Sequence, residues 1–130
     1  MKRAYFGIKF HQNNSNKSDI EAIVSVLRRA DIQTVCMASD IEKWGAVRLS
    51  LQELMAKTFA EIDNSQLVIL EVSEKGVGLG IEAGYAVAKG KQLVVLIKEG
   101  YELSGTMQGI ANLVIFYNDP EEIISQLKNL

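Results

Sequence analysis

A single carboxylate that follows a run of glycines is the feature of this sequence most suggestive of chemistry. Residues 68–87 read VILEVSEKGVGLGIEAGYAV, in which Gly76, Gly78 and Gly80 precede Glu82. The apolar start of this segment has the length and β-branched content of a buried strand, and the residues after the glycines are typical of a helix. Open α/β sheets build ligand sites from a strand, a glycine loop and a helix start, because backbone N–H groups there can face an anion.

The position of Glu82 suits a carboxylate that must stay charged. We expect the helix to begin at about Leu79, so that Glu82 lies near the positive end of the helix dipole and is ionised at neutral pH. Two simpler interpretations remain open at this point. The glycines could form only a tight turn, and Glu82 could only complement the helix dipole in solvent.

Composition excludes several classes of function. The chain has 130 residues, a net charge of −2, one cysteine and one histidine. This length predicts one domain over 1–130, and the charge offers no basic surface to nucleic acid. One cysteine and one histidine predict neither an internal disulfide nor a metal site, and we expect no cofactor. Without a signal-peptide core or a membrane-length apolar stretch, we expect a cytoplasmic protein with no membrane partner.

Short apolar runs alternate with amphipathic segments along the whole chain. The expected strands are 4–8, 32–38, 67–72, 93–97 and 113–117. The expected helices are 18–29, with a capping box at Ser18 and Glu21, 47–62, 79–89 and a last one that opens at Asp119.

This alternation predicts one α/β domain with a parallel sheet covered by helices on both faces. With five strands, the flavodoxin-like (Rossmann-like) order 2-1-3-4-5 is the preferred topology. Strands one and three are then neighbours at the topological switch point, where ligands bind beyond the carboxyl ends of the strands. Residues 5–9 and 73–82 should therefore form one cleft, in which Lys9 could meet a phosphate. Trp44, which follows the second strand, could stack on a base.

A dinucleotide site is one alternative, because residues 78–83 satisfy a GxGxxA pattern. The signal is weak for two reasons. In dinucleotide-binding folds the pattern follows the first strand, whereas here it follows the third, and Glu82 would put a negative charge beside the pyrophosphate.

The longer pattern resembles the nucleoside 2-deoxyribosyltransferase family, which includes relatives that hydrolyse nucleoside 5′-monophosphates at the N-glycosidic bond. The specific part of the resemblance is 71–86, with Glu-Val-Ser, Gly-Val-Gly, Glu and Gly-Tyr-Ala in order. Tyr5-Phe6-Gly7 looks like the end of the family's first strand. The segment 103–109 looks like the family's late serine-bearing loop, and the resemblance spans nearly the whole chain.

The resemblance implies a function and a set of site residues. Glu82 would be a nucleophile that forms a covalent glycosyl-enzyme, with water or a second base as the acceptor. Tyr5 would position Glu82 or the sugar, and Ser104 would act across the interface of a homodimer or a higher homo-oligomer. The expected substrate-binding residues are Gly7, Lys9, Trp44, Ser73, Gly76, Gly78, Gly80 and Ser104.

One departure from the family pattern leaves a second function open. The family usually has an aspartate on the helix before strand three, and the aligned residue here is Thr58. Glu61 and Asp63 are nearby in sequence but should point in other directions around the helix. The alternative to an enzyme is a non-catalytic module that binds nucleotides with the same fold.

Overall fold

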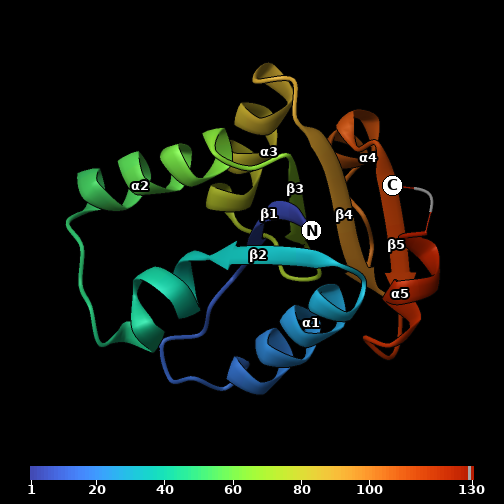
Figure 1. Ribbon diagram of the computed structural model, residues 1–130, viewed down its shortest axis with the longest axis horizontal. Coiled ribbons are helices and arrows are strands. Elements are labelled where there is room, and N and C mark those ends of the chain that lie inside the picture. Colours follow the sequence, from blue (N-terminus) through green and yellow to red (C-terminus); the bar gives the residue numbers. More distant parts are fainter. Residues whose placement is uncertain (129) are drawn as a thin grey trace.

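The computed structural model describes residues 1–128 and 130 and contains the predicted sheet (Figure 1). Its strands pair in the order β2-β1-β3-β4-β5, and every pair is parallel. The predicted α/β fold class and strand order are therefore confirmed. The strands are β1 (Lys2–Ile8), β2 (Ile32–Cys36), β3 (Leu67–Glu71), β4 (Gln92–Lys98) and β5 (Leu113–Tyr117).

Helices cover both faces of this sheet, as the sequence predicts. α1 (Lys17–Arg29) and α5 (Glu122–Gln126) pack on one face and share one apolar cluster. α2 (Leu51–Asp63) and α3 (Val77–Ala88) pack on the other, where Met107 of α4 (Gly105–Ile110) joins a second cluster. A π-helical turn, η1 (Met37–Ile41), and a 3₁₀ turn, η2 (Lys43–Gly45), connect β2 to α2.

The alternation of side chains along β1 decides which residues can reach each face. Phe6 packs in the cluster under α1 and α5, whereas Tyr5 packs in the cluster under α2 and α3. At the end of β3, Glu71 is buried and bonds Tyr117, so it belongs to the α1 side. The sheet thus separates residues that the sequence places in one cleft.

The predicted capping box at Ser18 is wrong, because α1 begins one residue earlier, at Lys17, after Asn16. Asn16 does not cap the helix with its side chain. Its Oδ1 accepts a hydrogen bond from the His11 amide (3.0 Å), and its Nδ2 donates to the Lys9 carbonyl (2.7 Å). Asn16 therefore fixes the loop after β1. The capping box of this fold is on α2, between Ser50 and Glu53.

In the described part of the chain, no helix is both long enough and apolar enough to cross a membrane. Nor do the described residues contain a group of three or more His, Cys, Asp or Glu side chains that could hold a metal ion.

Candidate active site

Glu82 lies in the second turn of α3, because the helix begins at Val77 and not at the predicted Leu79. Its carboxylate reaches the carboxyl end of β1. A Cβ atom added to Gly7 would lie 2.5 Å from Glu82 Oε1 and 2.6 Å from Leu70 Cδ2. Only a glycine leaves room for this approach, so Gly7 allows the carboxylate to come to the end of the sheet.

The Glu82 carboxylate is largely removed from water. Its Oε1 atom is buried and has no hydrogen-bond partner within the described residues. Burial raises the pKa of Glu82 to about 7, and a hydrogen bond from Tyr5 offsets part of this rise. The expectation of a fully ionised Glu82 at neutral pH is therefore wrong. The helix dipole acts mainly within the first turn, which Glu82 lies beyond, and desolvation dominates.

Tyr5 and Thr58 are the polar neighbours of Glu82 on this face. Tyr5 is only 2% exposed, and its pKa is raised far above the ordinary value by burial first and then by Glu82. It is therefore a neutral hydroxyl at any physiological pH. Thr58 is 3% exposed, and its hydroxyl donates a hydrogen bond of 2.8 Å to the Leu54 carbonyl. A threonine thus lines the same cavity as the carboxylate, at the position where the family pattern has an aspartate.

A cavity of about 230 Å³ opens beside these three side chains. Its walls come from the end of β1, from the turn after β2, from α2 and from α3. The polar side chains in the lining belong to Tyr5, Glu42, Thr58 and Glu82. The apolar part of the lining includes Phe10, Met37, Leu54 and Met55.

A second pocket, of about 340 Å³, shares Ile8, Gly78 and Glu82 with the cavity and adds Lys9, Gly76, Val77 and Leu79. The N-cap Gly76 makes no side-chain hydrogen bond to the first turn of α3, and Gly76, Val77 and Gly78 of this segment line the pocket. The Lys9 ammonium lies 3.5 Å from the Lys75 carbonyl oxygen, at the same rim. A lysine beside a helix N-terminus favours an anionic group in this pocket.

Other predicted site residues lie away from Glu82. Gly80 and Ser104 line a third pocket, of about 210 Å³, between α3 and α4. The Ser104 hydroxyl is 2.8 Å from the Thr106 hydroxyl and caps α4. Trp44 packs on Phe10, with ring centroids 5.8 Å apart, and lines a separate hollow beside α1. Trp44 is therefore not part of the cavity lining, although its neighbour Phe10 is.

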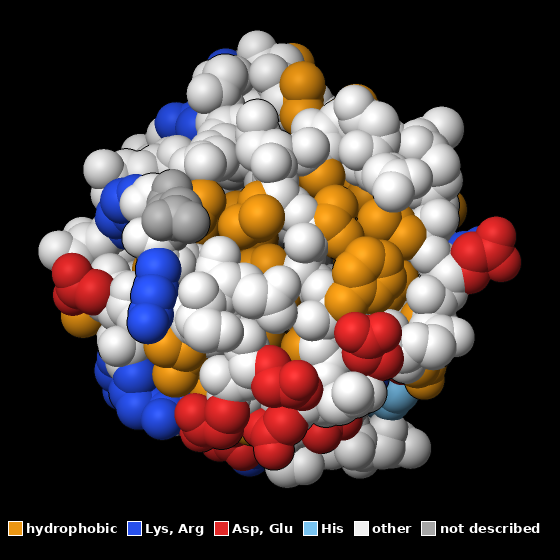
Figure 2. Space-filling view, turned by 90° about the vertical axis from the view of Figure 1, so that its right-hand side faces the viewer, with side chains coloured by type: hydrophobic (Ala, Val, Ile, Leu, Met, Phe, Trp, Pro, Cys, Tyr) orange, Lys and Arg blue, Asp and Glu red, His pale blue; other side chains and the backbone are white. Residues whose placement is uncertain are grey.

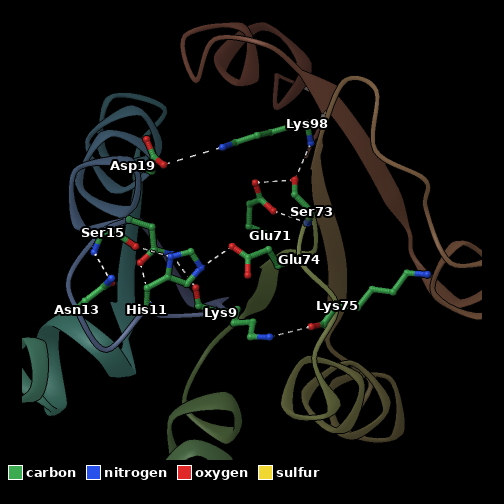
Figure 3. A network of polar contacts seen from close by, with 11 residues as sticks. Lys9, His11, Asn13, Ser15, Asp19, Glu71, Ser73, Glu74, Lys75 and Lys98 are labelled. Carbon is green, nitrogen blue, oxygen red and sulfur yellow. Dashed lines mark hydrogen bonds and ion pairs between the residues drawn. The ribbon is translucent and has the colours of Figure 1, made fainter.

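Ser73 belongs to a polar network on the α1 side of the sheet (Figure 3). Its amide and its hydroxyl donate hydrogen bonds of 2.6 and 3.0 Å to the two oxygens of Glu71, and its hydroxyl accepts one of 2.9 Å from the Lys98 amide. His11 Nε2 and Glu74 Oε1 are 2.5 Å apart. Ser73 thus joins the ends of β3 and β4, and the His11–Glu74 contact joins the loop after β1 to the loop after β3.

Glu61 and Asp63 point away from the cavity, as expected. Glu61 pairs with Arg3 and Lys57, and Asp63 accepts a hydrogen bond of 2.8 Å from the Tyr85 hydroxyl. The residue that the sequence did not indicate is Glu42. It lies in a polar loop without a motif, and only the fold of that loop brings it to the cavity lining.

No family model matches the chain, and no curated protein matches it in sequence. Solved structures do resemble it. The CMP N-glycosidase of Clostridium botulinum has a TM-score of 0.71 at 20% identity over 98% of both chains. The 2-deoxyribosyltransferase of Bacillus psychrosaccharolyticus has a TM-score of 0.73 at 11% identity, over 94% of this chain and 90% of its own. A conserved protein of Enterococcus faecalis has a TM-score of 0.77 at 16% identity, over 99% and 98%.

These identities are low, so the likeness concerns the fold. It extends over nearly the full length of the chains. The structural expectation raised by the sequence resemblance is confirmed: this chain shares the fold of nucleoside 2-deoxyribosyltransferases and nucleotide N-glycosidases.

Proposed function

We propose that this protein breaks the N-glycosidic bond of a nucleoside or a nucleoside 5′-monophosphate, with Glu82 as the nucleophile. The observation that carries the proposal is the Glu82 carboxylate, which has a buried oxygen without a partner and lies between two pockets. A base and a sugar phosphate need two such pockets on either side of the reacting carbon. The shared fold supports this class of substrate.

The reaction follows from a carboxylate at the anomeric carbon. An ionised Glu82 oxygen attacks C1′, the C1′–N bond breaks, and its electron pair leaves with the base. The product is a glycosyl ester on Glu82. Water or a second base then attacks C1′, which restores the carboxylate and retains the configuration of the sugar.

Tyr5 positions the nucleophile in this proposal. Because its hydroxyl stays neutral, it can donate a hydrogen bond to Glu82 and leave the other oxygen free to react. The lack of a partner at Glu82 Oε1 agrees with this division of roles.

The pocket of Lys9 and the first turn of α3 suits a 5′-phosphate or the sugar. Its lining includes Val77 and Gly78 of the first turn of α3, Lys9 with its ammonium group, and Glu82. Charge-assisted hydrogen bonds of this kind are about twice as strong as neutral ones.

The experiment that tests the proposal is detection of the glycosyl ester. The protein is incubated with 2′-deoxynucleosides and their 5′-monophosphates, quenched in acid, digested, and analysed by peptide mass spectrometry. The proposal expects a glycosyl adduct on the peptide that contains Glu82. Transfer of the sugar to an added free base would make the protein a transferase, and release to water alone would make it a hydrolase.

A nucleotide-binding module without catalysis is the second candidate, and Thr58 is the observation that favours it. Because Thr58 has no carboxylate to assist the departing base, the site could bind a substrate without cleaving it. This candidate expects nucleotide binding by calorimetry with no adduct and no release of base.

A further inference from the structure

Glu42 is a carboxylate in the cavity that the reaction above does not use. It comes from the turn after β2, whereas Glu82 comes from the helix after β3. In the sheet order β2-β1-β3, these elements stand on opposite sides of the end of β1. The two carboxylates therefore line the same cavity from opposite walls, with Tyr5 and Gly7 of β1 between them.

The backbone around Glu42 is closely fixed. Its amide donates a hydrogen bond of 2.8 Å to the Met37 carbonyl, and its carbonyl accepts bonds of 3.0 Å from Gly45 and 2.9 Å from Val47. The next two residues, Lys43 and Trp44, both have positive φ angles, of 49° and 59°. Such conformations are costly for residues other than glycine and are kept where surrounding contacts impose them. The turn thus presents Glu42 at a defined place.

The surroundings of Glu42 in the cavity are mainly apolar. Met37 and Met55 share the lining, and the Thr58 hydroxyl already donates to the Leu54 carbonyl. Burial raises the pKa of Glu42, and among the described residues no neighbouring charge or hydrogen bond contributes to this shift. A carboxyl group in such a place keeps its proton to a higher pH than an exposed glutamate does.

We propose that Glu42 contacts the nucleobase and supplies the proton that the base needs when it leaves. This inference rests on the proposed function. In this inference Glu42, from the turn after β2, assists the departing base. A carboxylate at position 58 could otherwise have done so, but that residue is Thr58. An apolar cavity with one carboxyl group at its far wall suits a flat base that is bound by its edge.

The proton transfer balances over the two half-reactions. As the C1′–N bond breaks, its electrons move into the base, and the Glu42 O–H proton passes to a ring nitrogen or an exocyclic oxygen. Glu42 is left as a carboxylate. In the second half-reaction it takes a proton from the attacking water or from the incoming base, which restores the acid.

The test compares two leaving groups on wild-type protein and on Glu42→Gln. One substrate is a 2′-deoxynucleoside, and the other is 4-nitrophenyl 2-deoxyriboside, whose nitrophenolate leaves without a proton. Glutamine keeps hydrogen bonding to the base but cannot give up a proton. We expect kcat/KM for the nucleoside to fall by about 100-fold or more. We expect the value for the nitrophenyl substrate to change by less than about threefold, because no proton transfer is lost.

Two control variants define the outcomes. Glu99→Gln removes an exposed carboxylate at the end of β4 and should leave both rates unchanged, whereas Glu82→Gln should abolish both. Equal losses on both substrates in Glu42→Gln, or no loss on either, would overturn the assignment of Glu42 and leave the proposed function standing. Wild-type protein that cleaves neither substrate would overturn the proposed function together with this inference.

Discussion

At the scale of the residue, the ionisation of Glu82 should control the rate. A nucleophilic carboxylate must be charged, and Glu82 has a pKa of about 7. Because this pKa is raised, the active form is lost as the pH falls through 7. For 4-nitrophenyl 2-deoxyriboside, whose leaving group needs no proton, we predict that kcat/KM rises about tenfold per pH unit below 7 and levels off above it. The pH profile of initial rates measures this, and a flat profile between pH 5.5 and 8.5 would contradict it.

The same raised pKa predicts an effect on stability that does not depend on activity. The folded protein holds a proton on Glu82 where the unfolded chain, with a pKa near 4.5, has lost it. Stability should therefore fall as the pH rises from about 4.5 to 7, and Glu82→Gln should remove this loss. We predict that the variant is more stable than wild type by about 1–3 kcal/mol at pH 8, after allowance for partial exposure, with little gain at pH 4.5.

Urea unfolding of both proteins at the two pH values measures this difference. Glu99→Gln, which removes an exposed carboxylate, is the matched control. Equal stabilities of wild type and Glu82→Gln at pH 8 would show that Glu82 is not the desolvated group described above.

At the scale of the element, the site depends on how closely α3 approaches the end of β1. Gly7→Ala would place a methyl group 2.5 Å from Glu82 Oε1 and 2.6 Å from Leu70. We predict a loss of about 1–3 kcal/mol in stability from this overpacking, and at least a 100-fold loss of activity from the displaced carboxylate.

Gly109→Ala is the matched control, because the added methyl group has nothing within 4 Å and lies in α4. It should be neutral or slightly stabilising, since alanine favours a helix over glycine. Thermal unfolding and initial rates measure both variants, and a Gly7→Ala protein as active as Gly109→Ala would contradict the packing argument.

The elements themselves were predictable because each depends on local pattern. Apolar runs gave the five strands, and their alternation with helices gave the parallel order. α3 begins two residues before its predicted start, because a glycine-rich first turn has no propensity signal for a helix. The sequence pattern does not indicate Asn16 as the residue before α1, because its side chain bonds the preceding loop instead of the helix. Whether the Asn16 side chain bonds the helix or the loop depends on tertiary contacts, which the local sequence does not reveal.

The candidate site was predictable only in part, because the face of the sheet on which a residue lies also depends on tertiary structure. Tyr5 and Gly7 of β1 line one cavity with Gly78 and Glu82 of α3, because α3 follows β3, the neighbour of β1 in the sheet. Ser73 follows the same strand but bonds Glu71 on the α1 side. Residues that are adjacent in sequence at a strand end can therefore lie on opposite faces of the sheet.

The turn after β2 was the least predictable part of the site. It contains two residues other than glycine at positive φ, and no pattern in its composition indicates that conformation. The conformation puts Glu42 in the lining of the cavity and Trp44 outside it. The sequence instead favours Trp44 as the residue of this segment that lies in the site.

At the scale of the whole molecule, the surface of α3 suggests where a second copy would bind. Val77 is 82% exposed and Ile81 44% exposed, one turn apart on the helix that also borders the Ser104 pocket. Exposed apolar side chains next to a pocket mark interaction surfaces. We infer a homodimer through this face of α3, which would bring Ser104 close to the partner subunit.

Ile81→Glu tests this arrangement, because a charge at the centre of an apolar interface opposes association. We predict a dimer for the wild type by size-exclusion chromatography with light scattering, and an at least tenfold weaker dimer for the variant.

Apolar and acidic side chains also gather on the side of the molecule that carries β5 (Figure 2). Phe116 of β5 is 41% exposed, so Phe116→Glu is the control that should leave the dimer intact. A monomeric wild type would contradict the inference.

The most direct test of the central claim is base release from 2′-deoxynucleosides and nucleoside 5′-monophosphates, followed by chromatography. Wild-type protein and Glu82→Gln are compared at pH 8, where most Glu82 side chains are ionised. We predict release of free base by the wild type and a loss of at least about 1,000-fold in the variant, with the fold retained. Release at similar rates by both proteins, or no release from any substrate by a folded wild type, would contradict the account.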